Sequence, residues 1–177
     1  MPFNLIKKYP ELLELLHLTE PQRLESLNGI LKKDIIDNDA LNFRTKRIRP
    51  IKGEEPDLGI VLRHLVTEDV EVERDGRIFK SRVFEMDRAQ RVHWIRNHLE
   101  ELNPDKVLVF SVEERDRRKR KDRVRTYLFD EAEEYVIVLD PQRSKKDYFL
   151  VTAYYLNESY GKKKMLKLWK KRLDKIH

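Results

Sequence analysis

The side chains best suited to acid–base or phosphate chemistry are found first in residues 91–98 of this sequence, RVHWIRNH. His93 and Arg96 are three positions apart, so in a helix they occupy neighbouring positions of one face. The unperturbed pKa of an imidazole lies near physiological pH, so His93 could act as a general acid or base, and the Arg96 guanidinium could bind phosphate through two hydrogen bonds. The alternative is a solvated helix face whose histidines pack beside Trp94, and helical periodicity alone favours this alternative.

Two expected strands, residues 124–129 and 148–156, supply the other polar candidates because polar and apolar side chains alternate along them. In the second strand, alternation assigns Leu150 to the polar face and gives Val151 and Ala153 to a face that suits a core. Strand tyrosines are more often packing residues than acids, so the cluster as a whole carries more weight than any single member. If the two polar faces coincide, one concave surface holds Arg125, Tyr127, Thr152 and Tyr154.

The strongest nucleic-acid signal is the basic run at 113–125, and a second basic segment precedes the last expected strand. Six of the seven residues from 115 to 121 are Lys or Arg, and such residues gain affinity for phosphates by releasing counterions. The alternative is a solvated turn whose charges prevent edge-to-edge pairing. The candidate nucleic-acid-binding residues are Arg117, Arg118, Lys119, Arg120 and Lys121 in the first loop and Arg143, Lys145 and Lys146 in the second.

The usual motifs of metal, nucleotide and covalent catalysis are missing from the sequence. No HExxH, E-x-K or D-x-K motif occurs, and His93 and His98 are five apart, so we expect no metal and no cofactor. His17 and His64 lie in Leu-rich helical patterns and are expected to be structural. A metal-independent ribonuclease needs a base for the 2′-hydroxyl, an acid for the leaving oxygen and cations around the phosphorane. The candidates for these catalytic roles are His93, Arg96, Arg125, Tyr127, Thr152 and Tyr154.

The first half of the chain is predicted to be mainly helical. Asp75-Gly76 is a strong two-residue turn signal, and the charged strands on either side of it predict an exposed hairpin. The expected segments are helix over 1–37, including Leu-dense residues 11–18 and a capping box at Thr19–Gln22, a basic extended stretch at 42–52, a helix from Pro56-Asp57 with Leu58, Val61, Leu62 and Leu65 buried, and a hairpin at 70–84.

The second half changes from helix to strands. A helix is expected over 87–102 with Val92, Ile95, Leu99 and Leu102 buried, then strands at 107–112, 124–129, 135–139 and 148–156, then a Lys-rich helix opening at Gly161. Short connections between the strands predict an antiparallel meander. The expected fold class is α+β, with N-terminal helices and a β-hairpin, a four-stranded antiparallel meander sheet and a C-terminal helix. We expect an N-terminal region at 1–84 and an α+β domain at 85–177.

Composition limits the classes of binding partner and the cellular compartment that we expect for this protein. The 177 residues hold 38 Lys+Arg against 32 Asp+Glu, a net charge of +6 that favours an anionic partner. There is no cysteine, which excludes a thiol nucleophile and a disulfide framework. The sequence shows neither a signal-peptide pattern nor an apolar run of membrane-spanning length. We therefore expect a cytoplasmic protein with no membrane partner.

Three motifs, taken in order, resemble those of a known nuclease superfamily. R-x-H-W-I-R at 91–96, R-T-Y at 125–127 and FLVTAYY at 149–155 are similar to phage-associated members of the barnase–EndoU–colicin–RelE superfamily. The resemblance covers roughly residues 85–160 and implies helices packed on a four-stranded antiparallel sheet and a metal-independent ribonuclease or ribonuclease toxin. By this resemblance the helix histidine maps to His93, the strand arginine to Arg125, the late hydroxyl to Thr152 and the following tyrosine to Tyr154.

Three functional hypotheses follow from these observations. The first is a metal-independent endoribonuclease, a toxin or phage-derived factor, that cleaves RNA by attack of the 2′-hydroxyl on the phosphodiester. The second is a non-catalytic module that binds nucleic acid through the basic sheet face and hairpin. The third is an interaction domain whose charged hairpins dock an acidic partner such as an antitoxin-like inhibitor.

Overall fold

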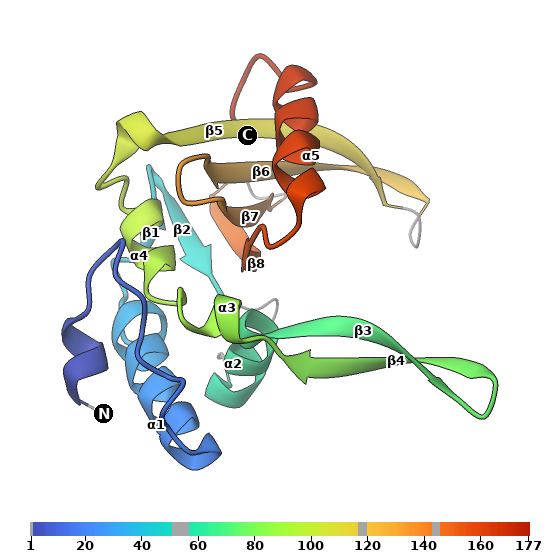
Figure 1. Ribbon diagram of the computed structural model, residues 1–177. Helices are drawn as coiled ribbons and strands as arrows, with labels where there is room; N and C mark the ends of the chain where they lie inside the picture. The colour runs from blue at the N-terminus through green and yellow to red at the C-terminus, as the bar shows by residue number, and fades with distance from the viewer. Residues whose placement is uncertain (1, 51–56, 117–119, 143–145) are drawn as a thin grey trace.

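The computed structural model describes residues 2–50, 57–116, 120–142 and 146–177. A six-stranded sheet with the order β1-β2-β8-β7-β6-β5 is the centre of this α+β fold. The N-terminal helices pack on one face of the sheet and helix α5 (Ser159–Lys170) covers the other, as Figure 1 shows. Each face therefore has its own hydrophobic core. No helix of the described residues is long and apolar enough to cross a membrane.

The predicted meander is confirmed, but it is only part of the sheet. Its strands, each antiparallel to the next, are β5 (Val107–Asp116), β6 (Lys121–Asp130), β7 (Tyr135–Pro141) and β8 (Asp147–Tyr155). Two further strands, β1 (Asn42–Phe43) and β2 (Lys46–Arg49), extend the sheet beyond β8, and β2 runs parallel to β8. The expectation of four strands was wrong because β2 is too short to show alternation and its pairing depends on distant contacts, such as Arg49 with Asp147 at 3.0 Å.

A β-bulge in β8 decides which of its side chains share a face. Val138 of β7 pairs with Thr152, and the next residue, Leu139, pairs with Leu150, which leaves Val151 as an extra residue. Leu150 consequently lies with Ala153 in the core beneath the N-terminal helices. Its expected place beside Thr152 was wrong, because a bulge shifts the alternation by one residue.

The predicted hairpin is confirmed and projects from the body of the protein (Figure 1). It consists of β3 (Thr67–Arg74) and β4 (Arg77–Phe84), and every residue of β4 is exposed. Asp75 and Gly76 both have positive φ angles, 52° and 69°. Two such residues in sequence give the turn whose twist matches the twist of paired strands.

The Leu-dense segment before helix α1 (Glu20–Leu31) is not helical, contrary to expectation. The N–H of Leu13 donates to the carbonyl of Gln90 at 3.0 Å, and the indole of Trp94 donates to the carbonyl of Glu11 at 3.0 Å. These long-range bonds replace the i→i+4 bonds that a helix would make. The capping box at the start of α1 is confirmed, with the Thr19 N–H donating to Gln22 Oε1 at 2.9 Å. After α1 come a π-helical turn (Lys32–Ile36) and helix α2 (Leu58–Val66), whose N-cap is Asp57.

The continuous helix expected over 87–102 is instead two short helices, α3 (Met86–Ala89) and α4 (Trp94–Leu99). Between them the bonds are i→i+3, for example from the Trp94 N–H to the Arg91 carbonyl at 2.9 Å. This tighter turn directs Trp94 toward the leucine-rich segment. Leu102, predicted to be buried, follows the end of α4 and is 61% exposed.

The larger core joins the two halves of the chain. Leu13, Leu27 and Leu65 from the first half are buried in the same cluster as Trp94 and Ile137 from the second half. Residues on both sides of the expected boundary at 84/85 therefore contribute to one core.

Candidate functional site

Four of the predicted polar residues lie on one face of the sheet. The register places Tyr127, Val138 and Thr152 in one row across β6, β7 and β8, and Tyr154 lies one row further along, opposite Val136. Arg125 is opposite Val112 of β5 on the same face. This is the face that α5 covers in part, so the four side chains belong to the same face of the sheet.

Tyr127 points into the core of that face rather than toward solvent. It is 4% exposed, its ring stacks on Phe110 with 5.4 Å between centroids, and its hydroxyl donates to Glu114 Oε2 at 2.6 Å. Burial, reinforced by the bond to Glu114, raises the pKa of Tyr127 far above its usual value. The neutral phenol therefore holds Glu114 in place.

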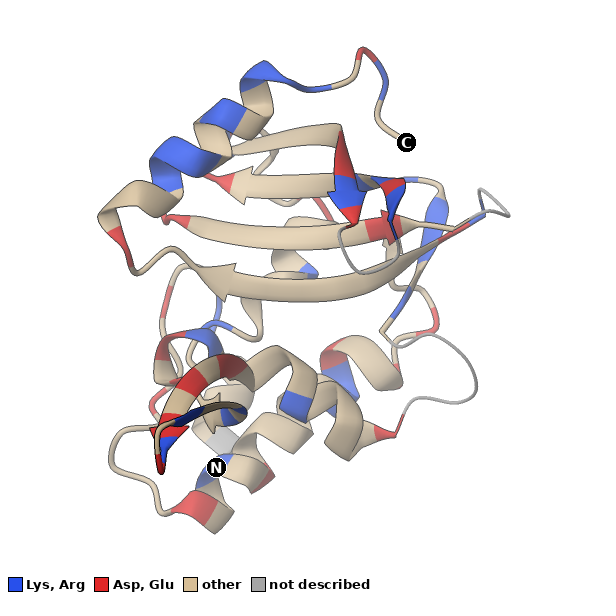
Figure 2. Cartoon of the chain, turned by 90° about the vertical axis from the view of Figure 1, so that its right-hand side faces the viewer, with Lys and Arg blue, Asp and Glu red and all other residues tan. Residues whose placement is uncertain are grey.

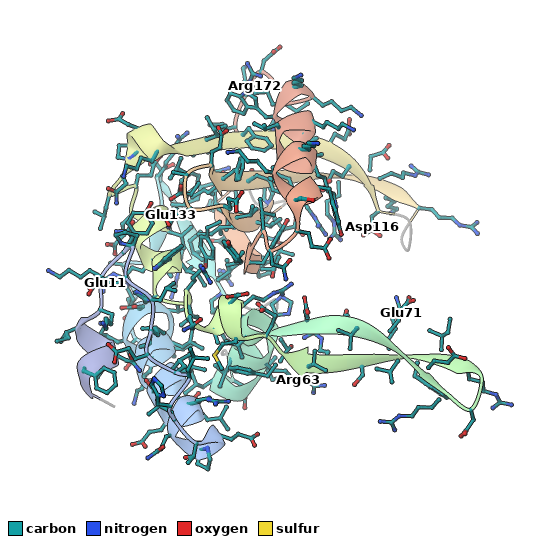
Figure 3. All side chains as sticks on the ribbon, viewed as in Figure 1. Glu11, Arg63, Glu71, Asp116, Glu133 and Arg172 are labelled. Atoms are coloured by element: carbon teal, nitrogen blue, oxygen red, sulfur yellow. The ribbon has the colours of Figure 1, made fainter. Side chains whose placement is uncertain are left out.

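Thr152 and Tyr154 line an open groove of about 310 Å³ together with His64, Arg82 and Arg88. We call this set the β8 groove. Its walls come from α2, the base of the β3–β4 hairpin, α3 and β8. The hairpin and the ends of β5 and β6 project on the same side of the molecule, where Glu71 and Asp116 mark them in Figure 3.

Ion pairs hold the two arginines of the groove. Arg82 Nε donates to Asp69 at 2.8 Å, and Arg88 lies 3.8 Å from Glu68 and donates to the Thr67 carbonyl at 3.0 Å. The guanidinium of Arg88 also lies 5.7 Å from the centre of the Tyr154 ring. The groove thus presents two ion-paired arginines and their partners Glu68 and Asp69 beside a phenol and a threonine hydroxyl. Guanidinium and hydroxyl groups are donors that can bind phosphate oxygens.

Tyr154 remains protonated in this setting. Burial raises the pKa of Tyr154, and the positive charges of Arg88 and Arg125 only partly oppose that rise. A neutral phenol can donate a hydrogen bond to a phosphate oxygen and can stack against a base.

His93 and Arg96 are not brought together with the other four candidates. His93 is 7% exposed, and its Nε2 bonds to the Glu11 carbonyl at 3.0 Å. Burial lowers the pKa of His93 to about 4, so the buried ring is neutral at physiological pH. Arg96 pairs with Glu100 at 2.7 Å and with Asp34 at 3.4 Å. Both residues flank the core beneath the N-terminal helices, on the other side of the sheet from Thr152.

The basic loops can be placed only in part. Arg117, Arg118, Lys119, Arg143 and Lys145 lie outside the described residues. Arg120 and Lys121 are exposed at the β5–β6 end, and Lys146 is exposed just before β8. A further basic surface, which the sequence reasoning did not assign to binding, runs along α5 (Figure 2). It consists of Lys163, Lys164, Lys167 and Lys170, all of them exposed.

His64, Arg82 and Arg88 are the groove residues that sequence reasoning missed. A Leu-rich helical pattern suggested a structural role for His64, and no local signal reveals that α2 packs against β8. The contact arises from the fold, where His64 Nε2 bonds to the Val151 carbonyl. The described residues include no group of three or more His, Cys, Asp or Glu side chains placed to hold a metal ion.

Comparisons of the chain with protein-family models, curated proteins and solved structures found no match.

Proposed function

We propose that this protein is a metal-independent endoribonuclease that binds RNA in the β8 groove and cleaves it by attack of the 2′-hydroxyl on the adjacent phosphorus. The observation that carries the proposal is the convergence of Thr152 and Tyr154 with Arg82 and Arg88 in one open groove. The net charge of +6 adds a general attraction for RNA. The resemblance of the three motifs to the barnase–EndoU–colicin–RelE superfamily points to the same chemistry.

In this proposal the arginines bind negative charge, and Thr152 and Tyr154 donate hydrogen bonds. Arg88 and Arg82 offset the negative charge that grows on the phosphorane, and Arg125, close enough to influence the Tyr154 phenol, extends this field along β6. The Thr152 hydroxyl donates to a non-bridging phosphate oxygen. The neutral Tyr154 phenol donates a second hydrogen bond or supports a base.

The test is incubation of the purified protein with total RNA, and with single- and double-stranded DNA, in EDTA. Thr152→Val keeps the β-branched shape and removes only the hydroxyl, and Thr45→Val, at an exposed turn position, is its matched control. Loss of one donor to the transition state should slow cleavage by about 100-fold, with RNA binding and the melting temperature retained. Cleavage that requires Mg²⁺, or cleavage that Thr152→Val and Tyr154→Phe leave unchanged, would reject this site.

The second candidate function is a module that binds nucleic acid without cutting it. The exposed lysines of α5 favour it, because they form a basic surface that does not depend on the groove. This alternative predicts a salt-dependent mobility shift without products. It also predicts that Lys163→Glu combined with Lys167→Glu abolishes the shift, whereas Thr152→Val has no effect on it.

A further inference from the structure

His64 of α2, far from Thr152 in sequence, contributes an imidazole to the β8 groove. His64 is half-buried and lines the same cavity as Thr152 and Tyr154. Its Nε2 bonds to the carbonyl of Val151, the extra residue of the β8 bulge. A bulged residue leaves a backbone group outside the regular ladder, and here that group holds a side chain of another element.

This hydrogen bond fixes the protonation pattern of the ring. A carbonyl oxygen only accepts hydrogen bonds, so Nε2 of His64 must carry the proton. In the neutral ring Nδ1 then carries the lone pair and is the basic nitrogen. The same pattern, with one ring nitrogen bonded to a fixed acceptor and the other left as a base, is how proteins prepare histidines for proton transfer.

The other described histidines lack this combination of position and an available nitrogen. His93 is buried against Glu11, away from the groove. His98 has both ring nitrogens bonded, Nδ1 to the Trp94 carbonyl at 2.8 Å and Nε2 to Asp130 at 3.1 Å. His64 therefore has the geometry of a general base, although His93 has the better motif.

We propose that His64 is the general base of the reaction, an inference that rests on the ribonuclease function proposed above. Nδ1 takes the proton of the 2′-hydroxyl as the bond from the 2′-oxygen to phosphorus forms and the bond from phosphorus to the 5′-oxygen breaks. The 5′-oxygen takes a proton from solvent, and the imidazolium later returns its proton to solvent. The products are a 2′,3′-cyclic phosphate and a 5′-hydroxyl.

The charged groups that face His64 across the groove are Arg82 and Asp69 from the hairpin strands, Glu68 from β3 and Arg88 from α3. Arg82 pairs with Asp69, and Arg88 pairs with Glu68. These pairs bring both signs of charge to the groove. These pairs remain in place in His64→Gln, so a pH limb that disappears with this substitution would belong to the imidazole itself.

The test compares single-turnover cleavage rates of the wild type, His64→Gln and His64→Ala between pH 5 and 9. A glutamine amide can still donate to the Val151 carbonyl but has no basic nitrogen, so it separates positioning from proton transfer. We expect His64→Gln to cleave at least about 100-fold more slowly, to lose the acid limb of the pH profile and to bind RNA as before. Added imidazole should restore part of the rate in His64→Ala. His17→Gln, at an exposed position, is the matched control.

The failures of the two proposals can be told apart. If the wild type cleaves RNA in EDTA and His64→Gln keeps its rate and its pH profile, the base is another group and only this inference falls. His64→Gln could instead cleave slowly with weakened RNA binding or a lower melting temperature, while imidazole fails to rescue His64→Ala. That result would mean that His64 only supports the bulge, and it would also overturn the inference that His64 is the general base. If the wild type cleaves no RNA, both proposals fall together.

Discussion

Replacing Asp130 with alanine should destabilise the protein severely, because this carboxylate joins three parts of the fold. Asp130 is fully buried at the end of β6. Its Oδ2 accepts from the Tyr9 hydroxyl at 2.6 Å and bonds to His98 Nε2 at 3.1 Å. Its Oδ1 accepts from the Glu133 backbone N–H at 3.0 Å. One side chain thus connects the N-terminal segment, α4 and the β6–β7 turn.

The loss of stability in Asp130→Ala can be worked out from the hydrogen-bond donors that lose their acceptor. Asp130→Ala leaves the buried His98 N–H without its partner, and also frees the Tyr9 hydroxyl and one backbone N–H. Each orphaned buried donor costs about 1–3 kcal/mol, and removing a buried carboxylate from its hydrogen-bonded partners costs about 3–5 kcal/mol in total. We therefore expect the free energy of unfolding to fall by about 4 kcal/mol. In a chain of this size such a loss lowers the melting temperature by roughly 10 °C.

Urea unfolding followed by tryptophan fluorescence measures this loss, since Trp94 stacks near His98 with 6.5 Å between ring centroids. Asp105→Ala, at an exposed position, is the control and should change stability by less than about 0.5 kcal/mol. In a double-mutant cycle, Asp130→Ala and His98→Ala should be coupled by at least about 1 kcal/mol. A loss below about 1 kcal/mol for Asp130→Ala would refute the reasoning, since it would mean that the three donors find other partners.

Three further predictions concern the pH dependence at Asp130, the hairpin turn at Gly76 and the hydroxyl of Tyr127. Burial alone would raise the pKa of Asp130, but hydrogen bonds from His98, Tyr9 and a backbone N–H hold it below its usual range. The contribution of the ionised Asp130 carboxylate to the free energy of unfolding is thus complete above the unfolded-state pKa and is lost as pH falls through the folded-state pKa. The urea midpoints of the wild type and Asp130→Asn should therefore converge below about pH 4. Gly76→Val, at φ 69°, should cost the hairpin about 1–2 kcal/mol, with faster amide exchange in 67–84 and unchanged exchange in the sheet. Tyr127→Phe should cost about 1 kcal/mol of stability yet leave RNA cleavage intact, because its hydroxyl is bonded to Glu114; a large loss of cleavage at unchanged stability would contradict this.

Short sequence patterns correctly predicted the elements whose formation depends mainly on neighbouring residues. Asp75-Gly76 specified its hairpin because few residue pairs accept two consecutive positive φ angles. Thr19 and Gln22 marked the start of α1 because a helix start needs partners for its free N–H groups. The short connections between β5 and β8 specified the meander because only antiparallel strands can be joined so briefly.

What the sequence left open depends on contacts between distant segments. The carbonyl of Glu11 is bonded by side chains from the start of α4, and this bonding keeps a leucine-rich stretch out of the helical conformation. The bulge at Val151 cannot be recognised from the sequence either, since valine suits a regular strand as well as a bulge. His64 could not be assigned to the groove without knowing that α2 packs against that bulge.

The β8 groove itself depends on such long-range contacts, and this determines where function can reside in the chain. Thr152 and Tyr154 come from the meander, whereas His64 and Arg82 come from residues before the expected boundary at 84/85. The larger core also draws on both sides of that boundary. A fragment that kept only the meander would retain the threonine and the tyrosine but would lose the imidazole and both arginines. The groups proposed to bind phosphate and the group proposed to move a proton therefore come together only when both halves of the chain are present. On this proposal, variation in α2 or in the hairpin should alter RNA cleavage as directly as variation in β8.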